Sequence, residues 1–454
     1  MGDQGSGRTA KEAGWHVSRY NISAPAPDSD KTIIANLFKG VCSTYTPLEC
    51  YLLSVLDELD EHHPIIERFA ERGIIADFDE RAAVEAMGRA SCTMTRMIGL
   101  TICPTMGCNF DCPYCFESHR IGRMSPETQD AVIGLAEKLI RVIRGDSMDI
   151  TWFGGEPLLM PDIIASLSER LRKLARENDL TYMARVVTNG YLLTPETEDI
   201  LENAGVKYLQ ITLDGMGETH NRTRHLAGGG PTFDRIVSNL RRLRYPFYVD
   251  IRHNVHEGNR EEVEKLSAFV RELDQESAAT LHYYPYAVSG NQASDERGSR
   301  LTLLCSSDAS DIGIRHDANR FHKGRGQVCM AHSLYGVGID DEGRLYKCWE
   351  DVDKPEHSFG HVKTWDPASP METAENRDML TAYLNTASPV PDPECRECVW
   401  LPACSGGCPS RRLFAKRDCV AYKDQPEKYA LALYERMLER ANGRPVQEDG
   451  LPGT

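Results

Sequence analysis

Cysteines are the residues of this sequence whose type and spacing point most directly to chemistry. The chain has 454 residues and 15 cysteines, four of them within residues 103–115 and five within residues 395–419. Cysteines that only fill an apolar core would scatter along the chain, and an odd number of cysteines cannot all pair as disulfides. Thiolates separated by a few residues are what zinc and iron–sulfur sites require. The sequence therefore predicts metal chemistry in two separate stretches.

The first cysteine group has the sequence Cys108-Asn-Phe-Asp-Cys112-Pro-Tyr-Cys115. Three thiolates at this spacing can hold one corner of a four-iron cubane and leave one iron open to another ligand, as catalytic metal sites do. A zinc loop completed by Cys103 or His119 is the alternative.

The elements that must position this motif alternate between strand and helix from about residue 97 to residue 286. Short apolar runs predict six strands, at residues 97–103, 149–155, 182–190, 208–215, 247–255 and 280–286. Helical spacing predicts helices between them, at residues 125–145, 160–178, 194–205, 232–244 and 259–273. This alternation favours a parallel α/β sheet, open or barrel-like, with its reactive groups on the loops after the strands.

The motif and this alternation together resemble the radical S-adenosylmethionine (SAM) superfamily, and Tyr114 matches the aromatic residue that precedes the third cysteine in that family. The resemblance implies a partial (β/α)6 TIM-like barrel whose open iron binds SAM and yields a 5′-deoxyadenosyl radical. It also implies that the SAM pocket is formed by Tyr114, Gly154, Gly155, Glu156, Asn189, Thr212, Asp214 and Arg252. Arg252 would face the SAM carboxylate; an arginine at the surface end of a strand is the alternative.

The C-terminal cysteines resemble the SPASM domain of that superfamily, and residues 214–236 match its SPASM-type members. The resemblance implies two auxiliary [4Fe–4S] clusters, so three clusters in all. The outer cluster would be held by Cys395, Cys398, Cys404 and Cys419, and the inner one by Cys329, Cys348 and Cys408. From its sequence, the stretch at 391–412 is expected to be nearly all loop and to need a metal to fold.

The inner cluster is one ligand short in this assignment. Cys305, His332 or an acidic residue could complete it, or the site could stay open and bind a substrate thiolate. Sulfatase-maturing members carry an aspartate directly after the cysteine that matches Cys348, whereas here Trp349 is followed by Glu350 and Asp351. This departure weakens the sulfatase interpretation, although a neighbouring carboxylate could substitute.

The N-terminal part resembles a winged-helix element, with strands at 15–23 and 32–38, helices at 46–60 and 63–73, and then an edge strand. The predicted organisation is a disordered segment (1–14), a winged-helix-like domain that recognises a peptide leader (15–95), the radical SAM barrel (96–300), the SPASM domain (301–425), and a C-terminal helix and tail (426–454).

Composition sets further expectations. The formal net charge of −16 disfavours a nucleic-acid surface. The sequence shows no apolar run of membrane-spanning length and no signal peptide, so we expect no membrane partner and a cytoplasmic location that keeps thiols reduced.

The resemblance implies an oxidoreductase that modifies a ribosomally made precursor peptide carrying a leader, with flavodoxin or ferredoxin as a reductant. Our leading hypothesis is thioether formation, in which a cysteine sulfur bonds to a carbon that has lost hydrogen. Carbon–carbon or other peptide crosslinking and anaerobic sulfatase maturation (formylglycine formation) are alternatives. An iron–sulfur protein that only transfers electrons is a third.

Overall fold

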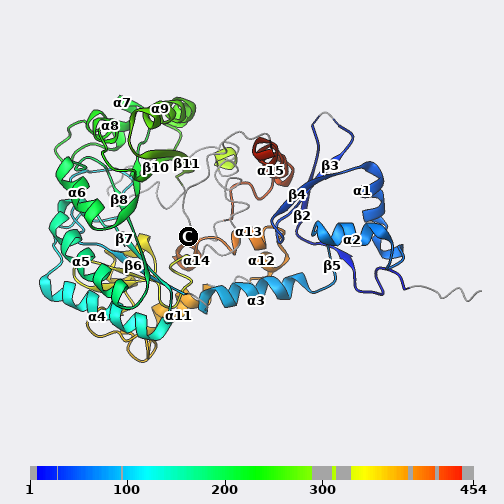
Figure 1. Cartoon of the computed structure of the whole chain (residues 1–454), viewed down its shortest axis with the longest axis horizontal. Helices are drawn as coiled ribbons and strands as arrows, with labels where there is room; N and C mark the ends of the chain where they lie inside the picture. The colour runs from blue at the N-terminus through cyan, green and yellow to red at the C-terminus, as the bar shows by residue number, and fades with distance from the viewer. Residues whose placement is uncertain are drawn as a thin grey trace, which may run out of the picture.

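The centre of the fold is one mixed sheet, seen in a computed structural model that describes residues 8–27, 29–93, 96–288, 309–312, 329–386, 392–414 and 419–441 (Figure 1). Six parallel strands pair in chain order, from β6 at one side to β11 at the other. They are β6 (Met97–Ile102), β7 (Ser147–Trp152), β8 (Thr181–Thr188), β9 (Val206–Thr212), β10 (Tyr248–Val255) and β11 (Thr280–Ala287). The structure confirms all six predicted strands of the α/β region.

Helices connect successive strands, and their apolar faces pack on the sheet in one large core. They are α4 (Pro126–Ile143), α5 (Pro161–Glu177), α6 (Pro195–Asn203), α7 (Gly217–Thr223), α8 (Phe233–Arg241) and α9 (Val263–Glu276), with short 3-10 turns η2 (Pro157–Leu159) and η3 (Arg260–Glu262). Side chains fix two helix starts: Ser125 accepts a hydrogen bond from the Thr128 amide, and Thr194 accepts one from the Thr197 amide. The five predicted helices are confirmed, and α7 is an additional one.

A C-terminal hairpin extends the same sheet beyond β6. Strand β12 (Val337–Ile339) runs parallel to β6, and β13 (Arg344–Tyr346) and β14 (Gly360–His361) follow antiparallel. The turn between β12 and β13 includes Gly343 at a φ of 91°, which favours glycine. Backbone hydrogen bonds therefore tie the segment between Cys329 and Cys348 to the first strand of the α/β region.

The N-terminal unit contains a three-stranded antiparallel sheet, β2 (Asn21–Pro25), β3 (Thr32–Asn36) and β4 (Val41–Tyr45), and a two-stranded pair, β1 (His16–Val17) with β5 (Ile75–Ala76). Its helical segments are α1 (Pro47–Ser54), η1 (Leu56–Glu58), α2 (Pro64–Glu71) and α3 (Glu80–Thr93). Thr46 caps α1 in a capping box with Glu49. Strand β4 and helix α3 were not predicted from the sequence.

The predicted disorder of residues 1–14 is wrong for residues 8–14. Ala10 is fully buried, its amide donates to the Leu59 carbonyl at 2.7 Å, and Thr9 pairs with Asp60. Burial of the small Ala10 side chain against neighbouring apolar residues fixes this segment, although its polar composition suggested otherwise.

The last part of the chain contains helices rather than the predicted loop at 391–412: α12 (Pro393–Glu397), α13 (Leu401–Cys404) and α14 (Pro409–Phe414) follow α11 (Arg377–Thr386) and the turns η5 (Trp349–Asp351) and η6 (Pro355–His357). Helices α12, α13 and α14 each have a proline in their first turn, and Asp392 caps α12 by accepting hydrogen bonds from the Glu394 and Cys395 amides. They are too short to show an apolar periodicity in the sequence.

The C-terminal helix α15 (Pro426–Ala441) begins at the predicted residue 426 and packs across β2, β3 and β4. Trp400, Tyr422 and Tyr429 share one apolar core with Tyr20 and other residues of the N-terminal sheet. Figure 1 shows α12, α13 and α15 beside this sheet. The N-terminal unit and the last cysteine segment are thus one packed body. Within the described residues, none of the helices is long and apolar enough to cross a membrane.

Candidate functional site

The first cysteine motif lies on the loop that leaves the carboxyl end of β6. Its backbone is tightly turned: the Cys115 amide donates to the Cys112 carbonyl at 3.1 Å, and the Phe110 amide donates to the Cys108 Sγ at 3.4 Å. His119 Nε2 lies 3.1 Å from the Cys115 Sγ. Burial raises the pKa of Cys108 to about 12 and that of Cys115 well above its usual range. Thiolates here therefore need a bound cation, such as the iron of a cluster.

All three cysteines line one cavity of about 300 Å³, a size suited to a small-molecule ligand. It also collects most of the SAM-pocket residues predicted from the sequence: Tyr114, Gly154, Gly155, Asn189, Thr212 and Arg252. Glu156 and Asp214 do not line it; both are fully buried. Within the described residues, no three Cys, His, Asp or Glu side chains are arranged to hold a single metal ion. Cluster ligands differ, since each binds a different iron.

Glycine is required where the loop after β7 meets the cysteine loop. A Cβ added at Gly154 or Gly155 would overlap the carbonyl oxygens of Thr105 or Gly107, and Gly154 has a φ of 102°. The Gly155 amide donates to the Thr105 carbonyl at 3.3 Å, and the Glu156 amide donates to the Gly107 carbonyl at 2.9 Å. The two loops therefore form one wall of the cavity through backbone contacts that only glycine allows.

Glu156 joins the loops after β7 and β8 from behind the cavity. Its Oε1 accepts from Thr188 Oγ1 at 2.7 Å and from the Leu158 amide at 3.0 Å, and its Oε2 accepts from the Asn189 amide at 2.7 Å. Asn189 in turn donates from Nδ2 to Asn109 Oδ1, inside the cysteine motif, at 2.7 Å. Because both carboxylate oxygens are used in this way, the Glu156 side chain fixes the loops, and Gly154 and Gly155 are the residues of this turn that line the cavity.

Tyr114 is held by a buried polar network. Its hydroxyl donates to Asp214 Oδ2 and accepts from Arg224 Nη1 at 2.8 Å, and Thr223 Oγ1 also donates to Asp214, at 3.1 Å. Residues 214–236 also reach the motif through the backbone, since the Asp111 amide donates to the His225 carbonyl at 3.1 Å. Asp214 therefore positions the cysteine loop through Tyr114 instead of lining the cavity.

Arg252, on β10, is oriented by two neighbours. Its Nε donates to Asn254 Oδ1 at 2.8 Å, and its guanidinium lies 4.3 Å from the centre of the Tyr286 ring. All three side chains line the cavity. A planar guanidinium held in this way is suited to bind a carboxylate with two parallel hydrogen bonds.

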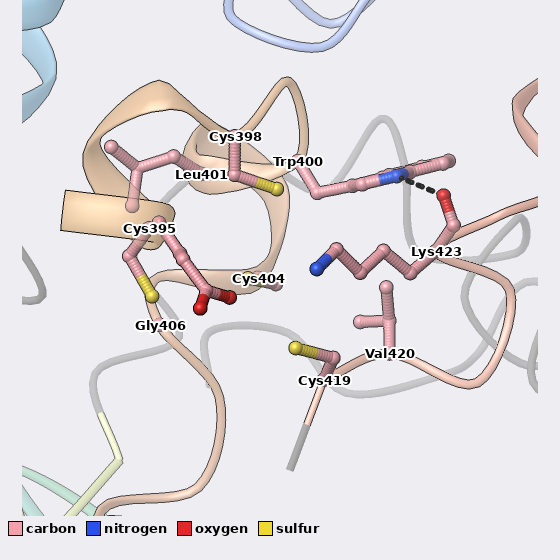
Figure 2. Close-up of a pocket in the computed structure, with 10 residues that line it drawn as sticks. Cys395, Cys398, Trp400, Leu401, Cys404, Gly406, Cys419, Val420 and Lys423 are labelled. Carbon is pink, nitrogen blue, oxygen red and sulfur yellow. Dashed lines mark hydrogen bonds between the residues drawn. The ribbon is translucent and has the colours of Figure 1, made fainter. Parts of the chain in front are cut away.

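The four cysteines predicted for the outer cluster surround one pocket. Figure 2 shows Cys395, Cys398, Cys404 and Cys419 facing it, with Trp400 and Lys423 at its side. Burial raises the pKa of Cys404 to about 11, and the charges of the other three thiols add to the rise. Four thiols around one pocket, three of which raise the pKa of the fourth, Cys404, fit a four-cysteine iron–sulfur cluster, because the iron would compensate their charges.

The three inner cysteines are also close enough to act on one another. Burial raises the pKa of Cys329, to which the Cys408 charge adds, and burial raises the pKa of Cys348, to which the charges of Asp351 and Cys329 add. The residues after Cys329 and Cys348 meet at β6, where Thr101 Oγ1 accepts from Trp349 Nε1 at 2.9 Å and lies 3.7 Å from the Met330 sulfur. These thiols fit three ligands of a second cluster near the cavity.

Of the options for a fourth inner ligand, His332 and the acidic residues Glu350 and Asp351 lie in described parts of the chain. Cys305 lies outside them. His332 is buried, its Nε2 has no hydrogen-bond partner in the described structure, and burial lowers its pKa to about 4. Asp351 is engaged, since it accepts from the Tyr383 hydroxyl and lies 2.9 Å from His357 Nδ1. Glu350 lines the SAM-motif cavity beside Trp349.

Two charged residues of the site escaped the sequence analysis. Glu117 lines the cavity, and burial, with the charges of Asp353 and Glu156, raises its pKa to about 8. Arg120 donates from Nε to Asp353 at 2.7 Å and pairs with Asp341 on the hairpin turn. Their partners are more than 200 residues further on, apart from Glu156, so no local pattern could have identified them.

Comparison with known proteins places this site in context. The pattern of the Radical SAM superfamily matches residues 102–270. The AdoMet-dependent heme synthase of Methanosarcina barkeri is 29% identical over 217 residues, which span 44% of this chain and 56% of that relative. The serine-type anaerobic sulfatase-maturating enzyme of Bacteroides thetaiotaomicron is 23% identical over 354 residues, 68% of this chain and 82% of that one.

Two solved structures share the fold. The enzyme anSMEcpe, with bound AdoMet and a peptide named Cp18Cys, superposes with a TM-score of 0.55 at 20% identity, over 76% of this chain and 99% of that one. SuiB of Streptococcus suis, bound to precursor peptide SuiA, superposes with a TM-score of 0.50 at 13% identity, over 90% of this chain and 99% of that one.

Proposed function

Because this chain is a radical SAM superfamily enzyme, we propose that it modifies a ribosomally made precursor peptide by joining a cysteine sulfur to a carbon of that peptide. The observation that carries the proposal is the shared cavity. Its walls include the three motif cysteines and also Trp349 and Glu350, which come directly after Cys348. A substrate in this cavity is within reach of both the SAM motif and the inner cysteine segment.

The peptide class is supported by the two structural neighbours, each of which holds a peptide. The SuiB match spans 90% of the chain, and residues 96–454 make up only about 79% of it, so the shared fold extends into the N-terminal unit. Strand β4 is an edge of the three-stranded sheet, and α1, which follows it directly, exposes Leu48 and Tyr51. An edge strand beside exposed apolar side chains is suited to bind a leader segment as an added strand.

The chain's residues would divide the work between holding the cofactor and holding the peptide. Arg252 would bind the SAM carboxylate, and the backbone of Gly154 and Gly155 would approach its amino group. When bound, SAM and the three clusters would supply the 5′-deoxyadenosyl radical and accept the electron released as the carbon–sulfur bond closes. The balance would then be complete: the peptide carbon would lose a hydrogen atom to the 5′-deoxyadenosyl radical, which becomes 5′-deoxyadenosine, the thiol would lose a proton, and the released electron would pass to a cluster.

The test is an anaerobic reaction of reconstituted enzyme with SAM, reductant and the cysteine-rich peptide encoded beside its gene. The expected product has lost two hydrogens and one free thiol, while 5′-deoxyadenosine accumulates. Cys108→Ala enzyme and a peptide with its cysteines replaced by alanine are the matched controls, and neither should give the product. Turnover of SAM with unchanged peptide mass would contradict the proposal.

Sulfatase maturation is the second candidate, and Glu350 favours it. Asp351 is engaged by Tyr383 and His357, whereas the Glu350 carboxylate lines the cavity and could act as a base there. Relatives named as serine- and cysteine-type anaerobic sulfatase-maturating enzymes add support. The same assay with a sulfatase peptide separates the two reactions, because formylglycine formation gives an aldehyde that reacts with hydrazine probes and a thioether does not.

A further inference from the structure

The three inner cysteines leave a four-iron cluster one protein ligand short, and a histidine one turn after Cys329 lies near charged residues that adjoin the other two cysteines. His332 follows Cys329 by one turn, with its amide donating to the Cys329 carbonyl at 2.8 Å. The charges of Lys347, which precedes Cys348, and of Arg412 both act on its ring. Arg412 is itself one turn from Cys408, since its amide donates to the Cys408 carbonyl at 3.0 Å.

The ring of His332 is buried and incompletely satisfied. The residue is 8% exposed, and its Nε2 has no hydrogen-bond partner in the described part of the chain. A buried imidazole nitrogen without a partner is costly, because it has lost water and gained nothing in return. Neutral imidazole is the commonest metal ligand among protein side chains, so a metal ion is a suitable partner for this nitrogen.

The neighbouring Lys347 is not the partner of His332 Nε2, because its amine already donates to backbone carbonyls. Its fully buried amine donates to the carbonyls of Ser333 and Gly336, which fixes the turn that carries His332. Glu350 is the rival ligand, because its charge also acts on the three inner thiols. Its carboxylate lines the SAM-motif cavity, however, and so lies on the side that a substrate would occupy.

We propose that His332 is the fourth protein ligand of the inner auxiliary cluster, through the buried nitrogen Nε2. The proposal rests on the proposed function only in requiring that the inner cluster exists. It makes this cluster a three-cysteine, one-histidine site closed by the protein, as histidine replaces cysteine on one iron of some other iron–sulfur centres. A closed inner cluster would accept electrons without binding the substrate thiolate.

The test uses full-length protein in which Cys108, Cys112 and Cys115 are replaced by alanine, so that only the auxiliary clusters contribute. Reconstituted and reduced protein is examined by pulsed electron paramagnetic resonance, with natural-abundance and ¹⁵N-labelled histidine. We expect a strong hyperfine coupling between the reduced cluster and a histidine nitrogen, with the ¹⁴N signal replaced by a ¹⁵N signal on labelling. His332→Ala should abolish the coupling and lower the iron content by about one to four atoms per chain.

His332→Cys should restore the iron content without the nitrogen coupling, which separates loss of a ligand from loss of folding. The control His361→Ala removes a histidine whose Nε2 already lies 3.0 Å from the Glu342 carbonyl oxygen, and it should change neither measurement. Full iron content without a histidine coupling would overturn the proposal, and a loss of iron on Glu350→Gln or Cys305→Ala would then identify the true ligand. Absence of the inner-cluster iron from the His332-containing protein would instead contradict the proposed function as well.

Discussion

Replacing Arg120 with alanine should release the loop that follows the cysteine motif. Arg120 is the cation between two nearly buried carboxylates, with Asp353 Oδ1 at 2.7 Å and Asp341 in direct contact. Their side chains are 5% and 1% exposed. Ser118, just before it, also donates from its amide to Asp353 at 3.0 Å. The pair of aspartates therefore anchors residues 118–120 to the hairpin and to the segment after Cys348.

The magnitude follows from leaving two buried carboxylates without their cation. Breaking a buried ion pair by removing one partner costs about 3–5 kcal/mol, and the partial exposure of Arg120 favours the lower end. A local opening that is about 3 kcal/mol easier corresponds to amide hydrogen exchange about 100-fold faster. Arg120→Lys keeps the charge but not the planar fork, so we expect an intermediate increase of about tenfold.

The effect should depend on pH through Asp341. Burial raises the pKa of Asp341 above its ordinary value, and Arg120 opposes this rise. A carboxyl whose pKa is raised on folding destabilises the folded state as pH rises through that pKa. Removing Arg120 raises the pKa further, so the variant's defect should be largest near neutral pH and should shrink at acidic pH, where Asp341 takes up a proton.

Hydrogen exchange followed by mass spectrometry on peptides covering residues 116–124 measures this directly, after correction for intrinsic exchange rates. Arg123→Ala is the matched control, because its partner Asp162 is exposed and the pair should contribute little. Exchange in the Arg120→Ala protein within about threefold of the parent, or a defect that grows at acidic pH, would refute this account of the loop.

Three further outcomes are expected. Arg252→Ala should weaken SAM binding about 10- to 100-fold in equilibrium dialysis, the value of one charge-assisted hydrogen bond. Asn254→Ala should give a smaller loss. An Arg252→Ala affinity equal to that of the parent protein would place the SAM carboxylate elsewhere. Burial lowers the pKa of His253 to about 3. The neutral folded form is therefore fully favoured above about pH 6.5, and the free energy of unfolding should fall by about 2 kcal/mol at pH 5 because the unfolded histidine takes up a proton. The urea midpoint of His253→Asn should vary less with pH than that of the parent protein. Cys395→Ala should speed hydrogen exchange in β2, because Cys395 shares a core with Ile22 and Ala24 of that strand. Cys50→Ala should not, because Cys50 packs against a different core, to which β2 contributes no buried residue.

Much of the fold and of the site could be predicted from local patterns. The six strands of the α/β region, five of its helices and the hairpin at Gly343 follow from apolar spacing, capping residues and a turn glycine, all of which are properties of short segments. The cysteine groups could also be predicted, because the ligands of one cluster must lie close together in space and several of these cysteines are close in sequence. The pocket that collects Cys395, Cys398, Cys404 and Cys419 agrees with their grouping.

The roles of single charged residues could not be predicted in this way. Glu156 and Asp214 occupy positions that suggested cofactor contact, yet their carboxylates are buried behind the cavity and hold other groups. The short helices of the last cysteine segment escaped because four to six residues are too few to show a periodicity. The packing of α15 on the N-terminal sheet, which brings the two ends of the chain together, has no local signal at all.

The sequence by itself determined the chemistry this protein is equipped for, since thiol number, spacing and order along the chain are fixed covalently. The tertiary structure alone decided which side chains face the cavity and which serve it from behind. It brought Arg120 to Asp341 and Asp353, and it placed His332 near Lys347 and Arg412, which adjoin Cys348 and Cys408. Such choices depend on burial, because a charged or polar side chain removed from water must find its partner wherever the folded chain places one.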